Sequence, residues 1–206
     1  MKTTQQIELP DGSIVTLDAG SEFKYSENFA DEREVYLKGE AYFEVAHNPN
    51  NPFIVKTENT LVKVLGTKFN IRSWQENEKV TVAVADGKVS FRNTELPDEV
   101  LIVKGQVSSI LGKSRPTTPE SEDIAKYLSW RTKEMSFQST PLNEVLMQLE
   151  RWYDLRFVLP DSSFGSDKIT IYLDNRPIEE VLELLSAVMN FEYSLKNNQV
   201  VFKENN

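Results

Sequence analysis

Residues 141–149 read PLNEVLMQL, and residues 177–185, 36 positions later, read PIEEVLELL. In both copies the apolar side chains recur at the spacing of an amphipathic helix. A short β-rich run precedes each copy (135–138 and 169–173), and another follows it (155–159 and 191–195). Tandem copies of one supersecondary unit are a repeat signature, so the sequence predicts two β-α-β units packed into one compact module.

Local signals predict where the elements of this module begin and end. Thr140 is expected to be the N-cap of the first helix, with Pro141 at its first helical position. Glu179 and Glu180 fall in the first turn of the second helix, where the helix dipole favours negative charge. Two β-rich runs flank Asn197-Asn198, which predicts a final hairpin.

Residues 1–113 are predicted to be all-β. Apolar and polar residues alternate along residues 34–45, which is the period of a half-buried strand. The dipeptides Asp11-Gly12 and Asp86-Gly87 each separate two such runs, and they predict hairpins because glycine accepts the positive φ of tight turns. About nine short strands are expected, arranged as a β-sandwich or a twisted β-stack.

A polar stretch with two prolines separates the two parts of the chain. Residues 114–133 are therefore predicted to be a linker, with a short amphipathic helix that carries Ile124, Tyr127 and Leu128 on one side. The predicted fold class is α+β with two domains. These are an all-β domain (1–113) and the paired β-α-β module (134–206).

Composition excludes several classes of partner and site. The net charge is −9, and both parts of the chain are acidic, so no basic surface is expected to follow a phosphate backbone. Nucleic acid is therefore not an expected partner. The chain has no cysteine, which excludes disulfides and thiolate zinc sites. No apolar run reaches the roughly 18 residues that a membrane span requires.

No pattern predicts a catalytic, metal or cofactor site, so the chain is not expected to be an enzyme. His47 lies in a turn rich in asparagine and proline, where a lone histidine is normally solvated. Glu40 and Glu44 share one face of a predicted strand, with their Cα atoms roughly 13 Å apart. That spacing exceeds the usual glycosidase pair, so two solvent-facing charges are expected and a hydrolase is disfavoured.

The aromatic residues leave two interpretations open, a sugar-binding platform or a protein contact. The candidates are Trp74, Trp130, Trp152, Tyr36, Tyr42 and Tyr172. Trp152 belongs to the helical stripe and is expected in the core, whereas Tyr36 and Tyr42 lie on the polar strand face and are expected to be exposed. A carbohydrate-binding β-sandwich module is therefore the alternative to a docking protein.

Several segments, in the expected order, resemble the FecR family of sigma-factor regulators. They are Leu9–Ser21, Arg33–Val45, Pro52–Val55, the most specific block Val62–Arg72, Val82–Val89 and Gly105-Gln106. From Trp130 through Trp152-Tyr153 and onward, the chain resembles the C-terminal domain appended to FecR proteins in Bacteroidetes. That domain is similar to the short N-terminal signalling domain of secretins and TonB-dependent receptors.

The resemblance implies a single-pass inner-membrane protein, usually an anti-sigma factor. Its periplasmic part would sense the periplasmic signalling domain of a TonB-dependent transporter. An extracytoplasmic-function (ECF) sigma factor would be bound through a cytoplasmic segment absent here, and a periplasmic or membrane protease often takes part in the relay. The chain is therefore interpreted as the periplasmic part, with a free-standing soluble relative as the alternative, and no cofactor is implied. The inducing ligand (a glycan or an iron chelate), the transporter and the oligomeric state stay open.

A docking surface is predicted in the paired β-α-β module, because small α/β modules often leave a sheet edge that can accept a partner strand. Residues 169–173 are short, β-rich and preceded by a polar loop, so they are the candidate edge; an inner strand is the alternative. The expected partner-binding residues are Lys168, Ile169, Ile171, Tyr172 and Arg176.

Overall fold

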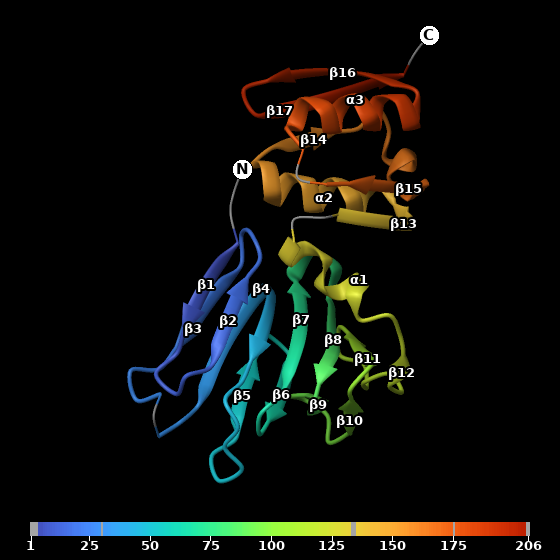
Figure 1. Ribbon diagram of the computed structural model, residues 1–206. Helices are drawn as coiled ribbons and strands as arrows, with labels where there is room; N and C mark the ends of the chain where they lie inside the picture. The colour runs from blue at the N-terminus through green and yellow to red at the C-terminus, as the bar shows by residue number, and fades with distance from the viewer. Residues whose placement is uncertain (1–3, 30, 133–134, 175, 205–206) are drawn as a thin grey trace. The chain divides into compact units, whose positions relative to one another are not determined.

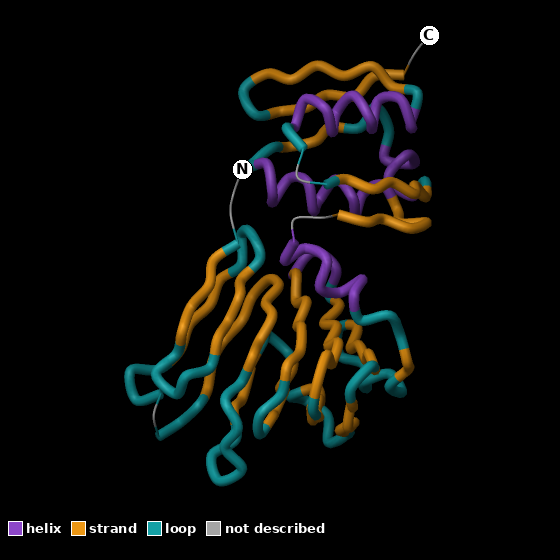
Figure 2. The backbone as a smooth tube through the Cα atoms, in the orientation of Figure 1, coloured by secondary structure: helices purple, strands orange, loops and turns teal. Residues whose placement is uncertain are grey.

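The structure is a computed structural model of the 206-residue chain and describes residues 4–29, 31–132, 135–174 and 176–204 (Figure 1). The chain divides into two compact units, a β-rich unit of residues 4–128 and an α/β module that begins at Ser129. Strands fill the first unit, whereas the two long helices belong to the second (Figure 2). The predicted α+β class is confirmed in a β-rich form.

The described part of the β-rich unit contains twelve strands, more than the nine or so expected. In chain order they are β1 (Gln5–Glu8), β2 (Ile14–Leu17), β3 (Glu22–Tyr25), β4 (Glu34–Glu44), β5 (Phe53–Lys56), β6 (Thr60–Val64), β7 (Lys68–Trp74), β8 (Lys79–Asp86), β9 (Lys88–Asn93), β10 (Glu99–Val103), β11 (Gln106–Leu111) and β12 (Glu120–Ser121). A 3₁₀ turn, η1 (Gln75–Asn77), joins β7 to β8, and a short helix, α1 (Ala125–Leu128), ends the unit.

Strand β4 organises this unit because it belongs to both halves of a curled sheet. Its first residues pair with β3 and, in parallel, with β5, whereas its last residues pair with β2 and β7. The change of partners falls at Gly39, whose φ of +112° favours glycine. The sheet order is β10-β9-β6-β5-β4-β7-β8-β11-β12, with β1, β2 and β3 branching from this path. The expected sandwich or twisted stack thus takes the form of one curled sheet.

The two predicted Asp-Gly hairpins have different outcomes. At Asp11-Gly12, β1 pairs with β2, and Gly12 adopts a φ of +79°, as the prediction requires. At Asp86-Gly87 the predicted hairpin is wrong, because β8 pairs with β7 and β11 while β9 pairs with β6 and β10. Gly87, with a φ of +91°, instead turns the chain from one half of the curled sheet to the other.

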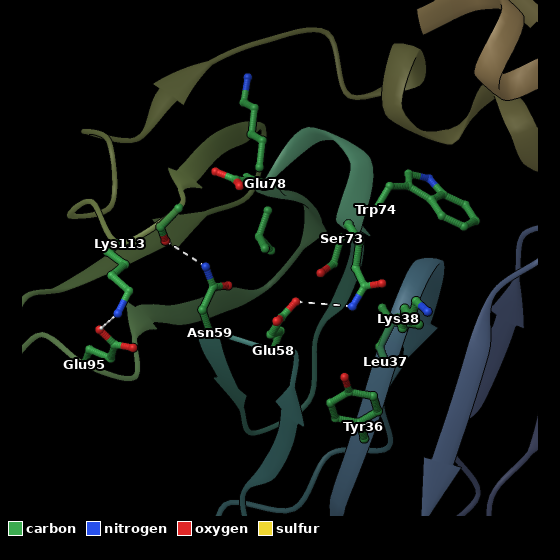
Figure 3. A pocket seen from close by; sticks show the side chains of 14 residues that line it. Tyr36, Leu37, Lys38, Glu58, Asn59, Ser73, Trp74, Glu78, Glu95 and Lys113 are labelled. Atoms are coloured by element: carbon green, nitrogen blue, oxygen red, sulfur yellow. Dashed lines mark hydrogen bonds and ion pairs between the residues drawn. The ribbon is translucent and has the colours of Figure 1, made fainter.

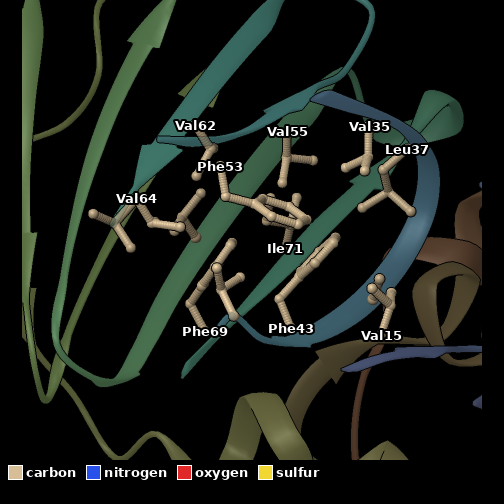
Figure 4. Packing of buried hydrophobic residues seen from close by; sticks show 14 of the residues in the cluster. Val15, Val35, Leu37, Phe43, Phe53, Val55, Val62, Val64, Phe69 and Ile71 are labelled. Atoms are coloured by element: carbon tan, nitrogen blue, oxygen red, sulfur yellow. The ribbon is translucent and has the colours of Figure 1, made fainter. Parts of the chain in front are cut away.

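The core of the β-rich unit is built from the alternating apolar residues of its strands (Figure 4). The rings of Phe43 and Phe69 stack with centroids 5.0 Å apart, and Phe53 meets Phe43 edge-on at 6.2 Å. The apolar residues of the alternating pattern in β4, which are Val35, Leu37, Ala41 and Phe43, are all buried. Period-two alternation therefore identified the inward face of this strand correctly.

Residues 114–128, part of the stretch predicted to be a linker, group with the β-rich unit. The Thr117 N–H donates to the Ser109 carbonyl at 2.9 Å, and the Ser108 hydroxyl donates to the Thr117 carbonyl at 2.7 Å. Strand β12 then pairs with β11, and helix α1 follows within the predicted short helix. A 3₁₀ turn, η2 (Ser129–Thr132), begins the α/β module.

The α/β module contains the two predicted β-α-β units. They are β13 (Met135–Pro141), α2 (Leu142–Tyr153) and β14 (Arg156–Val158), then β15 (Lys168–Leu173), α3 (Ile178–Met189) and β16 (Phe191–Lys196). A 3₁₀ turn, η3 (Ser162–Ser166), joins the two units, and β17 (Gln199–Glu204) closes the chain. β13 and β15 form one antiparallel sheet. In the other sheet, β17 pairs in parallel with β14 and antiparallel with β16, so the two strands of each unit belong to different sheets.

The 36-residue repeat extends to the ends of the helices. Both helices have 12 residues and begin directly after a proline, and both end at a residue in the left-handed region, Asp154 or Asn190. The predicted N-cap at Thr140 is wrong, because Thr140 lies in β13 and Pro141 takes the cap position with a ψ of 136°. Proline fixes φ near the value that both extended and helical residues share, so it can serve at this junction.

Candidate docking site

Strand β15 forms one of the two edges of the sheet that it makes with β13. Its residues pair antiparallel with β13, for example Ile171 with Phe137. Among the residues that the structure describes, no strand pairs with the opposite side of β15. An edge of this kind presents backbone N–H and C=O groups that can accept a strand from a partner.

The side chains of β15 alternate between the interior of the module and solvent. Ile169 and Ile171 are buried, so a partner could reach these two predicted residues only through their backbone. Lys168 and Tyr172 are exposed, and Tyr172 keeps 54% of its surface accessible. Of these four predicted residues, Lys168 and Tyr172 have side chains that a partner can contact. The side chains of Ile169 and Ile171 instead pack in the interior of the module.

Arg176, the fifth predicted residue, is engaged within the module. Its Nε donates to Asp174 Oδ1 at 2.5 Å, and its Nη1 lies 3.4 Å from Glu180 Oε2. The hydrogen bond with Asp174 raises the pKa of Arg176. The Arg176 carbonyl also accepts a 2.7 Å hydrogen bond from the Tyr153 hydroxyl, whose pKa is raised by burial. Arg176 therefore holds the turn between β15 and α3 in addition to any contact with a partner.

The carboxylates of β4 do not form an acid–base pair. Glu44 forms an ion pair with Lys68 at 2.7 Å. Glu40 was predicted to face solvent but is buried, and it is bound by two side chains of the neighbouring strand β7. The Asn70 amide donates to Glu40 Oε1 at 2.9 Å, and Arg72 Nε lies 3.6 Å from Glu40 Oε2. Each carboxylate is thus held by its own partners.

The aromatic residues do not form an exposed platform of tryptophans. Trp74, Trp130 and Trp152 are each at most 6% exposed, which confirms the prediction for Trp152. Tyr42 was predicted to be exposed but is buried on the covered face beside Glu40. Tyr36 is half-buried. Within the described residues, no group of three or more acidic or histidine side chains could hold a metal ion.

Sequence reasoning missed a buried arginine in the β-rich unit. Arg33 is 2% exposed and forms an ion pair with Asp11 at 2.6 Å. It also donates to the Ala46 and Asn51 carbonyls at 2.6 and 2.8 Å, and its guanidinium lies 5.5 Å from the centroid of the Phe53 ring. The partners come from separate segments of the chain, so no local pattern could have identified them.

Comparisons with known proteins cover both units of the chain. Residues 1–90 match the family model described as FecR protein, and residues 134–202 match the model described as FecR, C-terminal. Two crystal structures, each of a proposed anti-sigma factor from Parabacteroides distasonis ATCC 8503, are similar over 100% of this chain and 96% of their own. Their sequences are 30% and 31% identical to this one, with TM-scores of 0.86 and 0.85. No protein of curated function matches the chain significantly.

Proposed function

Because this chain belongs to the FecR family of anti-sigma factors, we propose that it is the signal-receiving, periplasmic region of a membrane-anchored regulator. FecR-family anti-sigma factors are regulators rather than enzymes, and membership implies a sigma factor as a partner. Within the part of the chain that the structure describes, no helix is long and apolar enough to cross a bilayer. The proposed relay ends at an ECF sigma factor, with a periplasmic or membrane protease as a further partner.

The α/β module is the proposed receiver. The module contains two β-α-β units and the final strand β17. Its five strands form one sheet of two strands and one of three, and its two long helices are α2 and α3. This arrangement supports the proposal that the module is similar to the short N-terminal domain of secretins and TonB-dependent receptors. The proposed partner is the periplasmic signalling domain of a TonB-dependent transporter in the outer membrane.

The observation that carries the docking proposal is the edge of β15. An extended segment of the transporter's domain would add to this edge through backbone hydrogen bonds, and side chains of the partner would contact Lys168 and Tyr172. A transient contact of this kind buries about 600–800 Å² per partner. Docking changes the state of the regulator only if the partner binds one conformation more tightly than another.

Calorimetry with purified signalling domains of TonB-dependent transporters from the source organism tests this proposal. Tyr172→Ala should weaken binding about tenfold or more, because truncating a tyrosine at the centre of an interface commonly costs about 2 kcal/mol. Lys168→Glu should change how strongly the affinity depends on salt concentration, and it should slow the association of the two proteins. Lys168 is preferred over Arg176 for charge reversal, because Arg176 already pairs with Asp174 and Glu180.

Lys196→Glu provides the matched control, since Lys196 is also exposed but lies on β16 in the other sheet of the module. It should leave the affinity unchanged. The proposal that the partner docks on β15 would be contradicted if both β15 variants bound with wild-type affinity. It would also be contradicted if only the Lys196 variant lost binding.

A further inference from the structure

A pocket opens in the β-rich unit where strands β4 and β7 separate. Their ladder ends at Gly39 and Ser73. From there β4 runs back through Lys38 and Tyr36 beside β3, while β7 leads into η1. The wedge between them holds a cavity of about 490 Å³ (Figure 3). Cavities of about 300–1,000 Å³ are the usual size of small-molecule sites.

The walls of this pocket come from five separate parts of the chain. Leu37 and Val80 are buried residues that line it, and the half-buried Tyr36 provides an aromatic ring. The β5–β6 turn adds Glu58 and Asn59, which lie around the same space as Tyr36 (Figure 3). The remaining charged and amide side chains in the lining are Lys38, Gln75, Glu78, Lys79, Glu95 and Lys113.

Hydrogen bonds hold several of these groups in place before any ligand binds. The Asn59 amide donates to the Gly112 carbonyl at 2.7 Å, and the Gln75 amide donates to Glu58 Oε2 at 3.3 Å. An ion pair of 3.0 Å joins Lys113 to Glu95 at the rim. A preformed site of this kind loses less entropy on binding than one that must be ordered by its ligand.

The pocket lining contains equal numbers of positive and negative side chains, and this favours an uncharged ligand. Three lysines and three glutamates line the pocket, and Lys113 already has a carboxylate partner within it. A charged ligand would therefore be attracted by one set of groups and repelled by the other. A hydroxyl group both donates and accepts, so it can bind a lysine and a glutamate at the same time. The ring of Tyr36 can pack against the apolar face of a sugar.

We propose that this pocket binds an uncharged saccharide of one or two sugar units. The site lies entirely within the β-rich unit, whereas the proposed docking edge lies in the α/β module. The proposal therefore stands independently of transporter docking. It also differs from an exposed tryptophan platform, because the hydrogen-bonding groups of the pocket supply most of the recognition.

Nuclear magnetic resonance titration of the ¹⁵N-labelled chain tests the proposal directly. The neutral probes are maltose, cellobiose, xylobiose, mannobiose and di-N-acetylchitobiose at millimolar concentrations. At least one should give saturable amide shifts confined to the pocket segments 36–38, 58–59, 73–80 and 112–113 and to residue 95. Glucuronic acid, an anion at neutral pH, and 6-amino-6-deoxyglucose, a cation, serve as charged probes and should bind more weakly.

Two variants with matched controls test the assignment of residues. Glu58→Gln should weaken binding of the probe about tenfold to a hundredfold, because it removes a charge-assisted hydrogen bond while keeping the size of the side chain. Glu27→Gln, at an exposed residue outside the pocket, should have no effect. Tyr36→Ala should also weaken binding, with Tyr25→Ala as its exposed counterpart.

Several results would overturn the proposal. They are the absence of saturable shifts with every neutral probe, shifts that map outside the pocket, tighter binding of the charged probes, or wild-type affinity in Glu58→Gln. If Tyr36→Ala perturbs folding, the amide spectrum of that variant will reveal it. The comparison of Glu58→Gln with Glu27→Gln then still tests whether the pocket binds the saccharide.

Discussion

Gly39 is predicted to be a residue of β4 that no other amino acid can replace without a large loss of stability. Its φ of +112° lies in a region that L residues rarely adopt. A Cβ atom at this position would lie 2.5 Å from the Ser21 hydroxyl oxygen and 2.8 Å from the Ser21 Cα. Ser21 cannot move aside freely, because its hydroxyl accepts from the Glu40 N–H and donates to the Glu40 carbonyl, each at 2.9 Å.

These contacts set the expected size of the effect. Holding a residue with a side chain in such a backbone conformation costs about 1–3 kcal/mol. Forcing an additional methyl group against Ser21 costs about 1–3 kcal/mol more, as overpacking usually does. Gly39→Ala should therefore lower the free energy of unfolding of the β-rich unit by about 2–6 kcal/mol.

Gly12→Ala is the control, because Gly12 also has a positive φ (+79°) but a Cβ there would meet nothing within 4 Å. It should cost only the backbone strain, about 1–2 kcal/mol. Urea unfolding combined with amide hydrogen exchange is the appropriate assay, since the two units can unfold separately. Equal losses for both variants would show that the approach to Ser21 does not constrain β4. A loss below about 0.5 kcal/mol for Gly39→Ala would refute the reasoning altogether.

Two further predictions concern the α/β module. Trp152 and Val188 occupy equivalent positions of the repeat, but Trp152 is 3% exposed and Val188 is 51% exposed; Trp152→Ala should therefore cost about 3–5 kcal/mol and Val188→Ala less than about 0.5 kcal/mol in urea unfolding. Similar losses of unfolding free energy in the two variants would mean that Val188 on α3 is as buried as Trp152 on α2. The pKa of Tyr153 is raised by burial, with its hydroxyl donating to the Arg176 carbonyl. Its contribution to stability is complete below the ordinary tyrosine pKa of about 10 and is lost as the pH rises further. Stability measured against pH above about 10 should fall less steeply in Tyr153→Phe, and an unchanged slope would contradict this assignment.

Much of the α/β module could be predicted from the sequence because its signals are local. The apolar stripe of each helix repeats at helical spacing, and the same nine-residue pattern recurs 36 residues later. The final hairpin was also predicted, and Asn197 and Asn198 both have the positive φ that two-residue hairpin turns prefer. The one local error, Thr140 as N-cap, is a shift of a single residue.

Candidate site residues were predicted less completely, because a side chain's surroundings depend on other strands. Alternation along β4 identified the core face correctly, but Glu40 and Tyr42 on its opposite face are buried. Their cross-strand neighbours, Arg72 and Asn70, lie 32 and 28 residues further along the chain and have no periodic relation to them. The pocket between β4 and β7 likewise joins segments that no sequence window contains.

The amino-acid sequence by itself determined the strands, the helices, the duplicated β-α-β unit and the family, because each depends on residues that are neighbours along the chain. Only the tertiary structure decided that β4 changes partners at Gly39, that Asp86-Gly87 crosses between the halves of the sheet, and that β15 lies at an edge. The physical reason is that backbone preferences and amphipathic periodicity act over a few residues, whereas strand pairing joins segments that are distant in sequence.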